Sequence, residues 1–165
     1  RDRNKLKRIA EQYKLPLLED AAEALGSSFN GIQAGTMGDM GCYSFNGNKI
    51  ITTGGGGMVV AQDEKMLKKI KHLSTTAKTD PLRYYHDEVG YNYRLVNILS
   101  AIGVAQLELL NKFVKRKIAI SEYYREELNN IGDIGFQYVD DAVISNEWLF
   151  TITTSSMDAL SLIHI

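Results

Sequence analysis

The sequence predicts an α/β fold, in which helices alternate with short apolar strands. Three observations point to it: an amphipathic helical pattern over residues 1–13, short apolar runs at residues 15–19, 41–45 and 58–61, and a long helical pattern over residues 95–130. Helices that alternate with short buried strands are typical of this class. With 44% hydrophobic residues in a chain of 165, the sequence can form a packed core and is not a disordered tail.

Each predicted element of the first half has a local signal. Residues 1–13 carry apolar side chains at helical spacing on one face. Residues 15–19 form the short apolar run that a buried parallel strand shows, and acidic residues stand at its end. Residues 26–41 contain several glycines and are expected to turn before a second strand at residues 41–45.

The second half begins with a predicted strand at residues 58–61, after which Asp63 caps a helix that runs to about residue 73. Residues 74–92 are polar and aromatic without a regular period. The long helical pattern of residues 95–130 ends at glycines that follow it, and residues 148–154 alternate as a strand does.

Composition excludes several function classes. The 19 Lys and Arg residues nearly balance the 20 Asp and Glu residues, so we expect no nucleic-acid partner. No apolar run approaches the roughly 18 residues of a membrane helix, so we expect no membrane partner. Cys42 is the one cysteine and cannot form an internal disulfide, which favours a cytoplasmic location. His72, His86 and His164 lack metal-ligand spacing, so we predict no metal site.

Acidic residues follow the first predicted strand, where residues 19–23 read EDAAE. Open α/β sheets bind ligands at the carboxyl ends of their strands, which makes this segment a candidate binding site. An acidic residue in such a place is also often a solvated loop charge or a helix cap. Position alone leaves both interpretations open.

Lys49 stands between an apolar strand and the pair Ile50 and Ile51. Its ammonium is therefore expected to be partly desolvated, which favours a neutral amine that attacks carbonyl groups. Four consecutive glycines at residues 54–57 indicate that the backbone passes close to something bulky, although a flexible hairpin would look the same.

Two nucleotide-binding motifs are excluded. A Walker-type phosphate loop needs its lysine after the glycines, whereas Lys49 precedes residues 54–57. No Gly-x-Gly-x-x-Gly opens a helix after a strand, which excludes the dinucleotide fingerprint. A third cluster, GYNYRL at residues 90–95, precedes the long helix and has an alternative interpretation as ordinary packing.

Three segments in register carry a resemblance: EDAAEALGS at residues 19–27, SFNGNK followed by TTGGGGM within residues 44–58, and GYNYRL at residues 90–95. Together they closely resemble the DegT/DnrJ/EryC1/StrS family of pyridoxal phosphate-dependent sugar aminotransferases, over residues 1 to about 153. Residues 46–53 and 86–94 look most like the branch that acts on nucleotide-linked 4-keto sugars in bacillosamine and legionaminic acid synthesis.

The resemblance implies part of the large domain of a fold-type I aminotransferase, with a three-layer α/β/α sheet. Residues 1–94 would be a partial cofactor-binding large domain without its N-terminal portion. Residues 95–131 would be a long connecting helix, and residues 132–165 the start of a truncated small C-terminal domain. Segment 155–165 matches nothing we can place. A chain that lacks the remaining parts is expected to retain the cofactor weakly.

The same resemblance assigns roles to residues. Lys49 would be the catalytic residue that holds pyridoxal 5'-phosphate covalently and moves a proton. Asp20 would pair with the pyridine nitrogen, because a protonated ring draws electrons from the carbon that loses its proton. Ala22 would lie flat against the ring, and Ser44 would bind the phosphate.

Two further residues are implied to bind the cofactor. Glu23 departs from many relatives, which have glutamine or histidine there, and a carboxylate would repel the phenolate oxygen unless it is protonated or turned away. Asn92 matches a residue that reaches the phosphate of the neighbouring subunit's cofactor. A homodimer with a shared active site is therefore expected.

The implied reaction transfers an amino group from glutamate to a nucleotide-linked 4-keto sugar. Three alternatives stay open: a pyridoxal phosphate-binding regulator or inactive fragment of the same fold, a related dehydratase with histidine in place of the lysine, and a purely structural role for Lys49. The presence of lysine at position 49 speaks against the dehydratase and does not signal a regulator.

Overall fold

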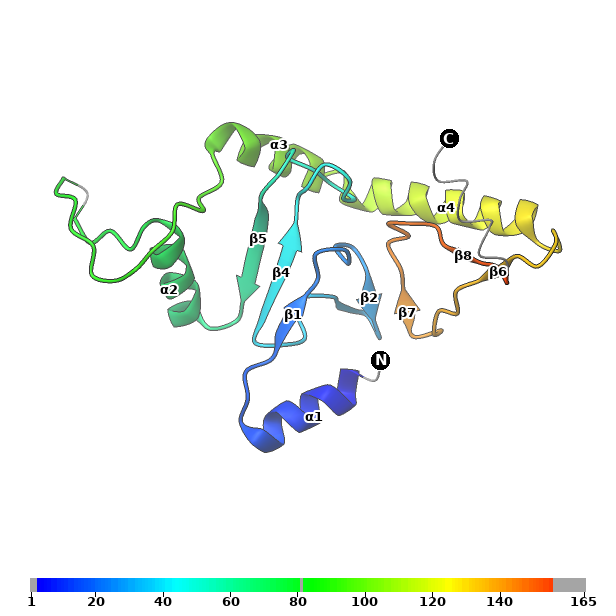
Figure 1. The fold of residues 1–165 in the computed structure, drawn as a ribbon, viewed down its shortest axis with the longest axis horizontal. Coiled ribbons are helices and arrows are strands. Elements are labelled where there is room, and N and C mark those ends of the chain that lie inside the picture. The colour runs from blue at the N-terminus through cyan, green and yellow to red at the C-terminus, as the bar shows by residue number, and fades with distance from the viewer. Residues whose placement is uncertain (1–2, 81, 156–165) are drawn as a thin grey trace.

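A computed structural model describes residues 3–80 and 82–155 and has a mixed α/β architecture (Figure 1). Its central sheet has three strands in the order β1, β4, β5, formed by Leu18–Asp20, Met40–Ser44 and Gly57–Ala61. Strand β1 is parallel to β4, whereas β5 is antiparallel to it. The predicted α/β class is confirmed, and β4 and β5 lie where the sequence places strands.

Four helices accompany the sheet: α1 (Arg3–Tyr13), α2 (Glu64–Ser74), α3 (Asn97–Leu107) and α4 (Leu110–Leu128). Helix α2 begins as predicted, since the Asp63 side chain accepts a hydrogen bond from the Lys65 amide. Figure 1 shows α1 beside the end of the sheet where β4 begins, and α3 beside the end where β4 finishes. Among the described helices, none is long and apolar enough to cross a lipid bilayer.

The single helix predicted over residues 95–130 is instead two helices, which is a correction. Between α3 and α4 the chain makes a tighter 3₁₀-type turn, in which the Leu109 amide donates to the Gln106 carbonyl three residues back. The Gln106 side chain bonds the backbone of Thr52 and so fixes the end of α3 against another loop. Neither glycine nor proline stands at the break, so helical periodicity does not detect it.

The first predicted strand is shifted and less buried than expected. Strand β1 covers Leu18–Asp20 rather than residues 15–19, because the Leu17 amide donates to the Asp39 carboxylate instead of a strand partner. Leu18 is 57% exposed, and within the described chain β1 pairs with β4 alone. The prediction of a parallel strand holds, whereas the prediction of full burial is wrong.

Several short strands were not expected. Strand β2 (Ser28–Phe29) pairs with both β3 (Ile32–Gln33) and β7 (Val143–Ile144), and β6 (Gly135–Phe136) pairs with β8 (Ile152–Thr153). Of the strand predicted at residues 148–154, only β8 is present, because the earlier part binds other loops. The predicted tail at residues 155–165 lies outside the described residues from position 156 on.

The core lies where the central sheet meets the loop after β4. Its buried residues are Ala21, Tyr43, Phe45 and Ile51. Tyr43 donates its hydroxyl to the Ala34 carbonyl at 2.6 Å, and burial, reinforced by the Glu19 carboxylate, raises the pKa of this phenol. Glu19 in turn accepts hydrogen bonds from the amides of Gly35, Met37 and Gly38, which hold the loop between β3 and β4 against β1.

Asn146 attaches the C-terminal segment to the rest of the chain. Its side chain is buried, and its Nδ2 donates to the carbonyls of Glu23 and Leu25, both at 2.9 Å. Its Oδ1 accepts from the Trp148 amide at 3.0 Å, and its own amide donates to Ser27 Oγ. One side chain therefore connects segments that lie more than 100 residues apart in the sequence.

Replacing Asn146 with alanine is expected to lower the free energy of unfolding by about 1–3 kcal/mol, because the carbonyls of Glu23 and Leu25 lose their donor. The measurement is urea unfolding followed by circular dichroism. Asn111→Ala, at an exposed position of α4, is the control and should change the value by less than about 0.5 kcal/mol. Equal effects of the two substitutions would show that Asn146 is not an anchor.

Candidate active site

Parallel pairing brings two predicted site residues to the same edge of the sheet. Asp20 ends β1 and Ser44 ends β4, and the strand register aligns Asp20 with Cys42. The Ala21 amide then donates to the Cys42 carbonyl at 2.9 Å, which continues the pairing past Asp20. The carboxyl ends of β1 and β4 therefore form one edge, the position at which α/β sheets present ligand-binding groups.

The loop that carries Lys49 closes over this edge. Its two ends are tied together, because the Thr53 amide donates to the Phe45 carbonyl at 3.0 Å. Ile51 is 1% exposed and anchors the loop in the core. From α3, Gln106 both donates to and accepts from the Thr52 backbone, at 2.8 and 3.0 Å. Lys49 is thus carried by a loop fixed at several points, which limits where its amine can go.

The Lys49 amine lies between a carboxylate and an aromatic ring. Its Nζ is 3.3 Å from Glu23 Oε1 and 3.9 Å from the centre of the Trp148 ring. The Lys49 side chain is only 13% exposed, so the predicted partial desolvation is present. The sequence argument from apolar neighbours did not include this ion pair or this cation–π contact.

Two different structural requirements explain the glycines after Lys49. Gly54 and Gly56 have φ angles of +80° and +89°, in the region that favours glycine. A Cβ on Gly57 would collide with the Tyr43 carbonyl oxygen, because this residue pairs with the end of β4. The predicted close approach of backbone therefore occurs at Gly57, whereas Gly54 and Gly55 face open space.

The other predicted residues are placed as follows. The Asp20 carboxylate accepts a hydrogen bond from the Ala22 amide at 3.1 Å and, among the described residues, makes no ion pair. The Ser44 hydroxyl accepts from the Asn46 amide at 3.3 Å, at the start of the Lys49 loop. Asn92 lies elsewhere, paired with Thr75 just after α2.

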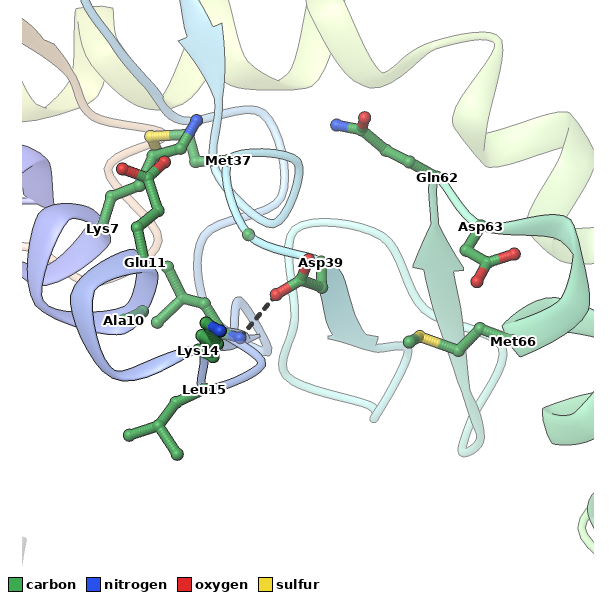
Figure 2. A pocket seen from close by; sticks show the side chains of 12 residues that line it. Lys7, Ala10, Glu11, Lys14, Leu15, Met37, Asp39, Gln62, Asp63 and Met66 are labelled. Carbon is green, nitrogen blue, oxygen red and sulfur yellow. Dashed lines mark hydrogen bonds between the residues drawn. The ribbon is translucent and has the colours of Figure 1, made fainter.

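Two of the cavities in the described chain lie beyond opposite ends of β4. One of about 370 Å³ adjoins the candidate site and is lined by Lys49, Trp148 and basic residues of α4, Arg116 and Lys117. Figure 2 shows the other, of about 360 Å³, between α1 and the start of α2, where the Asp39 carboxylate bonds the Leu17 amide. None of the predicted site residues lines this second cavity.

One cluster of potential metal ligands is formed by residues whose spacing in the sequence does not resemble a metal site. In the structure, one ligand atom from each of His72, Asp87 and Glu88 lies within 4.8 Å of the others. The hydrogen bond from His72 holds the pKa of Asp87 below its usual range. Lys69 also pairs with Glu88, so a cation here would compete with an ammonium. His164, considered with His72 in the sequence, lies outside the described residues.

Sequence reasoning missed the contribution of Trp148 to the surroundings of Lys49. Its indole Nε1 donates to the Asn48 carbonyl at 2.6 Å, across a separation of 100 residues. The sequence predicted a strand at residues 148–154 and no contact with Lys49. The chain has only one tryptophan, but the sequence does not show which residues it contacts.

The ends of β1 and β4 and the loop after β4 carry three groups: an amine, a carboxylate without an ionic partner among the described residues, and a hydroxyl. A fixed lysine amine can bond an aldehyde carbon, and a carboxylate can hold a protonated ring nitrogen. A serine hydroxyl beside backbone amides can bind a phosphate oxygen. This donor set suits a ligand that carries all three of these features.

The comparisons with known proteins agree with this chemistry. A protein of Bacillus subtilis (strain 168) named "Putative pyridoxal phosphate-dependent aminotransferase EpsN" is 44% identical over 145 residues, which are 88% of this chain and 37% of that protein. GDP-perosamine synthase of Escherichia coli O157:H7 is 38% identical over 157 residues, 95% of this chain and 43% of the enzyme. The chain thus spans about two fifths of the length of these relatives.

The fold agrees as well. The crystal structure of DesV from S. venezuelae superposes on 97% of this chain with a TM-score of 0.88 and 27% sequence identity, and the match covers 43% of DesV. The family match covers residues 2–162, which extends past residue 153, where the resemblance was expected to end. This chain belongs to the DegT/DnrJ/EryC1/StrS aminotransferase family.

Proposed function

We propose that this chain supplies the lysine and the acid of a pyridoxal 5'-phosphate-dependent sugar aminotransferase site. The reaction would move an amino group from glutamate to a nucleotide-linked 4-keto sugar. One observation carries the proposal: Lys49, whose side chain is largely buried, stands on the loop that follows β4, and Asp20, which has no ionic partner among the described residues, ends the parallel strand β1 that pairs with β4.

The residues at this edge fit the cofactor. Lys49 would bind the aldehyde carbon, and Asp20 would pair with the pyridine nitrogen. The small Ala22 leaves room for a flat ring, and Ser44 would bind a phosphate oxygen. Glu23 turns its carboxylate toward the Lys49 amine, so the repulsion expected between it and a phenolate is reduced by that pairing.

Bound pyridoxal phosphate supplies an electron sink for the carbon that loses a proton. The chain's own residues do the rest. The Lys49 amine would take a proton from the substrate carbon and give it to the cofactor carbon that was the aldehyde, since a fixed amine can act as base and then as acid. The Asp20 carboxylate would keep the ring nitrogen protonated through a charge-assisted hydrogen bond. The closed loop would hold the amine in reach of both carbons.

The substrate class is supported by the names of relatives and by charge. GDP-perosamine synthase names a nucleotide-linked sugar. In this chain, Arg116 and Lys117 line the cavity beside Lys49, and their charges suit the phosphates of such a substrate. The sugar, its nucleotide and the bacillosamine and legionaminic acid branch stay predictions.

A homodimer is part of the proposal. Asn92 sits after α2, on a separate segment from Lys49, and would reach the cofactor phosphate of a second subunit. Neighbouring side chains would support such a contact, because Tyr91 and Tyr93 are exposed and stack on each other with ring centres 5.1 Å apart. We propose the cytoplasm as the location of the enzyme.

The Lys49→Arg variant tests the lysine. Arginine keeps the positive charge but does not bond aldehydes, so borohydride should trap no pyridoxyl group at this position. Glutamate-dependent turnover should fall by at least about 100-fold. The measurement is mass spectrometry of peptides after reduction. Lys117→Arg, in the same cavity, should leave trapping unchanged. An adduct that persists in Lys49→Arg at another lysine would contradict the proposal.

The Asp20→Asn variant tests the acid. An opposite charge close to a titrating group shifts its pKa by roughly 1–3 units, so loss of this carboxylate should slow the glutamate half reaction about 10- to 1000-fold. Trapping at Lys49 should persist. The rate is followed by stopped-flow absorbance. Asp141→Asn, at an exposed position, should behave as the wild type. A half reaction within about twofold of the wild type would refute the role of Asp20.

A further inference from the structure

Trp148 is the only tryptophan of the chain, and its ring covers the amine of Lys49. The indole is fixed at its edge, since Nε1 donates to the Asn48 carbonyl next to that lysine. The ring face lies 3.9 Å from Lys49 Nζ. The same side chain thus holds both the backbone before Lys49 and the amine at the end of its side chain.

The backbone at Trp148 is held by the buried anchor Asn146. Asn146 Oδ1 accepts from the Trp148 amide, and its Nδ2 donates to the carbonyl of Glu23. Within residues 3–80 and 82–155, Glu23 and Trp148 contact the Lys49 amine from distant parts of the sequence. Asn146 is 3% exposed, so the connection between the two contacts is shielded from water.

We propose that Trp148 is a positioning residue for Lys49, an inference that rests on the proposed function. With Glu23, it holds the amine in place and shields it from water. An aldehyde must take the lysine as a neutral amine, and a ring that attracts cations holds a neutral amine less strongly. The contact therefore restrains the unreacted amine and weakens when the amine reacts.

Two substitutions separate the ring face from the rest of the side chain. Trp148→Leu removes the aromatic face and the indole donor. Trp148→Phe keeps an aromatic face over the amine and loses only the hydrogen bond to Asn48. Tyr138→Leu removes an exposed aromatic ring from the same C-terminal segment and is the matched control. The Asn146 anchor is unchanged in all three variants.

The first measurement needs no cofactor. Trace acetylation with acetic anhydride, read by mass spectrometry, gives the reactivity of Lys49 relative to Lys68, whose side chain is 74% exposed. In Trp148→Leu this ratio should rise about three- to tenfold, the range that loss of one cation–π contact allows. In Trp148→Phe and Tyr138→Leu it should stay within about twofold. An unchanged ratio in Trp148→Leu would overturn the proposal.

The second measurement uses pyridoxal phosphate at limiting concentration, with borohydride trapping. In Trp148→Leu, at least about threefold less pyridoxyl group should be trapped on Lys49, although the Lys49 amine of this variant is more reactive toward acetic anhydride. A merely unfolded variant would raise labelling at every buried lysine alike. If no pyridoxyl group is trapped on Lys49 of the wild type, the proposed function fails, and the acetylation ratio still decides the role of Trp148. If the wild type and Trp148→Leu trap equal amounts of pyridoxyl group on Lys49, the positioning role is wrong.

A third measurement leaves Trp148 in place. Because the chain has one tryptophan, its fluorescence reports only on this ring. Lys49→Gln removes the ammonium from the ring face and should change the emission intensity. Lys68→Gln, on an exposed face of α2, should not change it. Equal emission intensity from the wild type, Lys49→Gln and Lys68→Gln would show that the Trp148 ring does not cover Lys49.

Discussion

The parallel pairing of β1 with β4 is the constraint on which the candidate site depends. It aligns Asp20 with Cys42 and so brings the acid at the end of β1 to the edge from which the Lys49 loop departs. A shift of this register by one residue would turn Asp20 to the other face of the sheet, because side chains alternate along a strand.

A second constraint closes the site from the C-terminal segment. Asn146 binds the backbone of Glu23, and Trp148, two residues later, lies on the Lys49 amine. The surroundings of the amine are therefore assembled from the β1 end, the loop after β4 and a segment beyond α4. Such long-range closure explains why a lysine on a loop can be largely buried.

The sequence predicted what local patterns encode. Strands β4 and β5, the Asp63 cap and the partial burial of Lys49 follow from apolar runs, capping chemistry and a lysine next to apolar residues. Asn30-Gly31 between β2 and β3 is a common two-residue hairpin signal, so this short hairpin was also predictable from the sequence. The break before α4 and the contact of Trp148 arise from distant partners, Thr52 and Asn48, which no local pattern contains.

A crystal structure of the chain grown with pyridoxal phosphate tests the central claim most directly. The account predicts a ring joined to Lys49 Nζ, with its nitrogen about 2.7–2.9 Å from an Asp20 carboxylate oxygen and its phosphate near Ser44. A ring bound to another lysine, or one whose nitrogen faces away from Asp20, would contradict it.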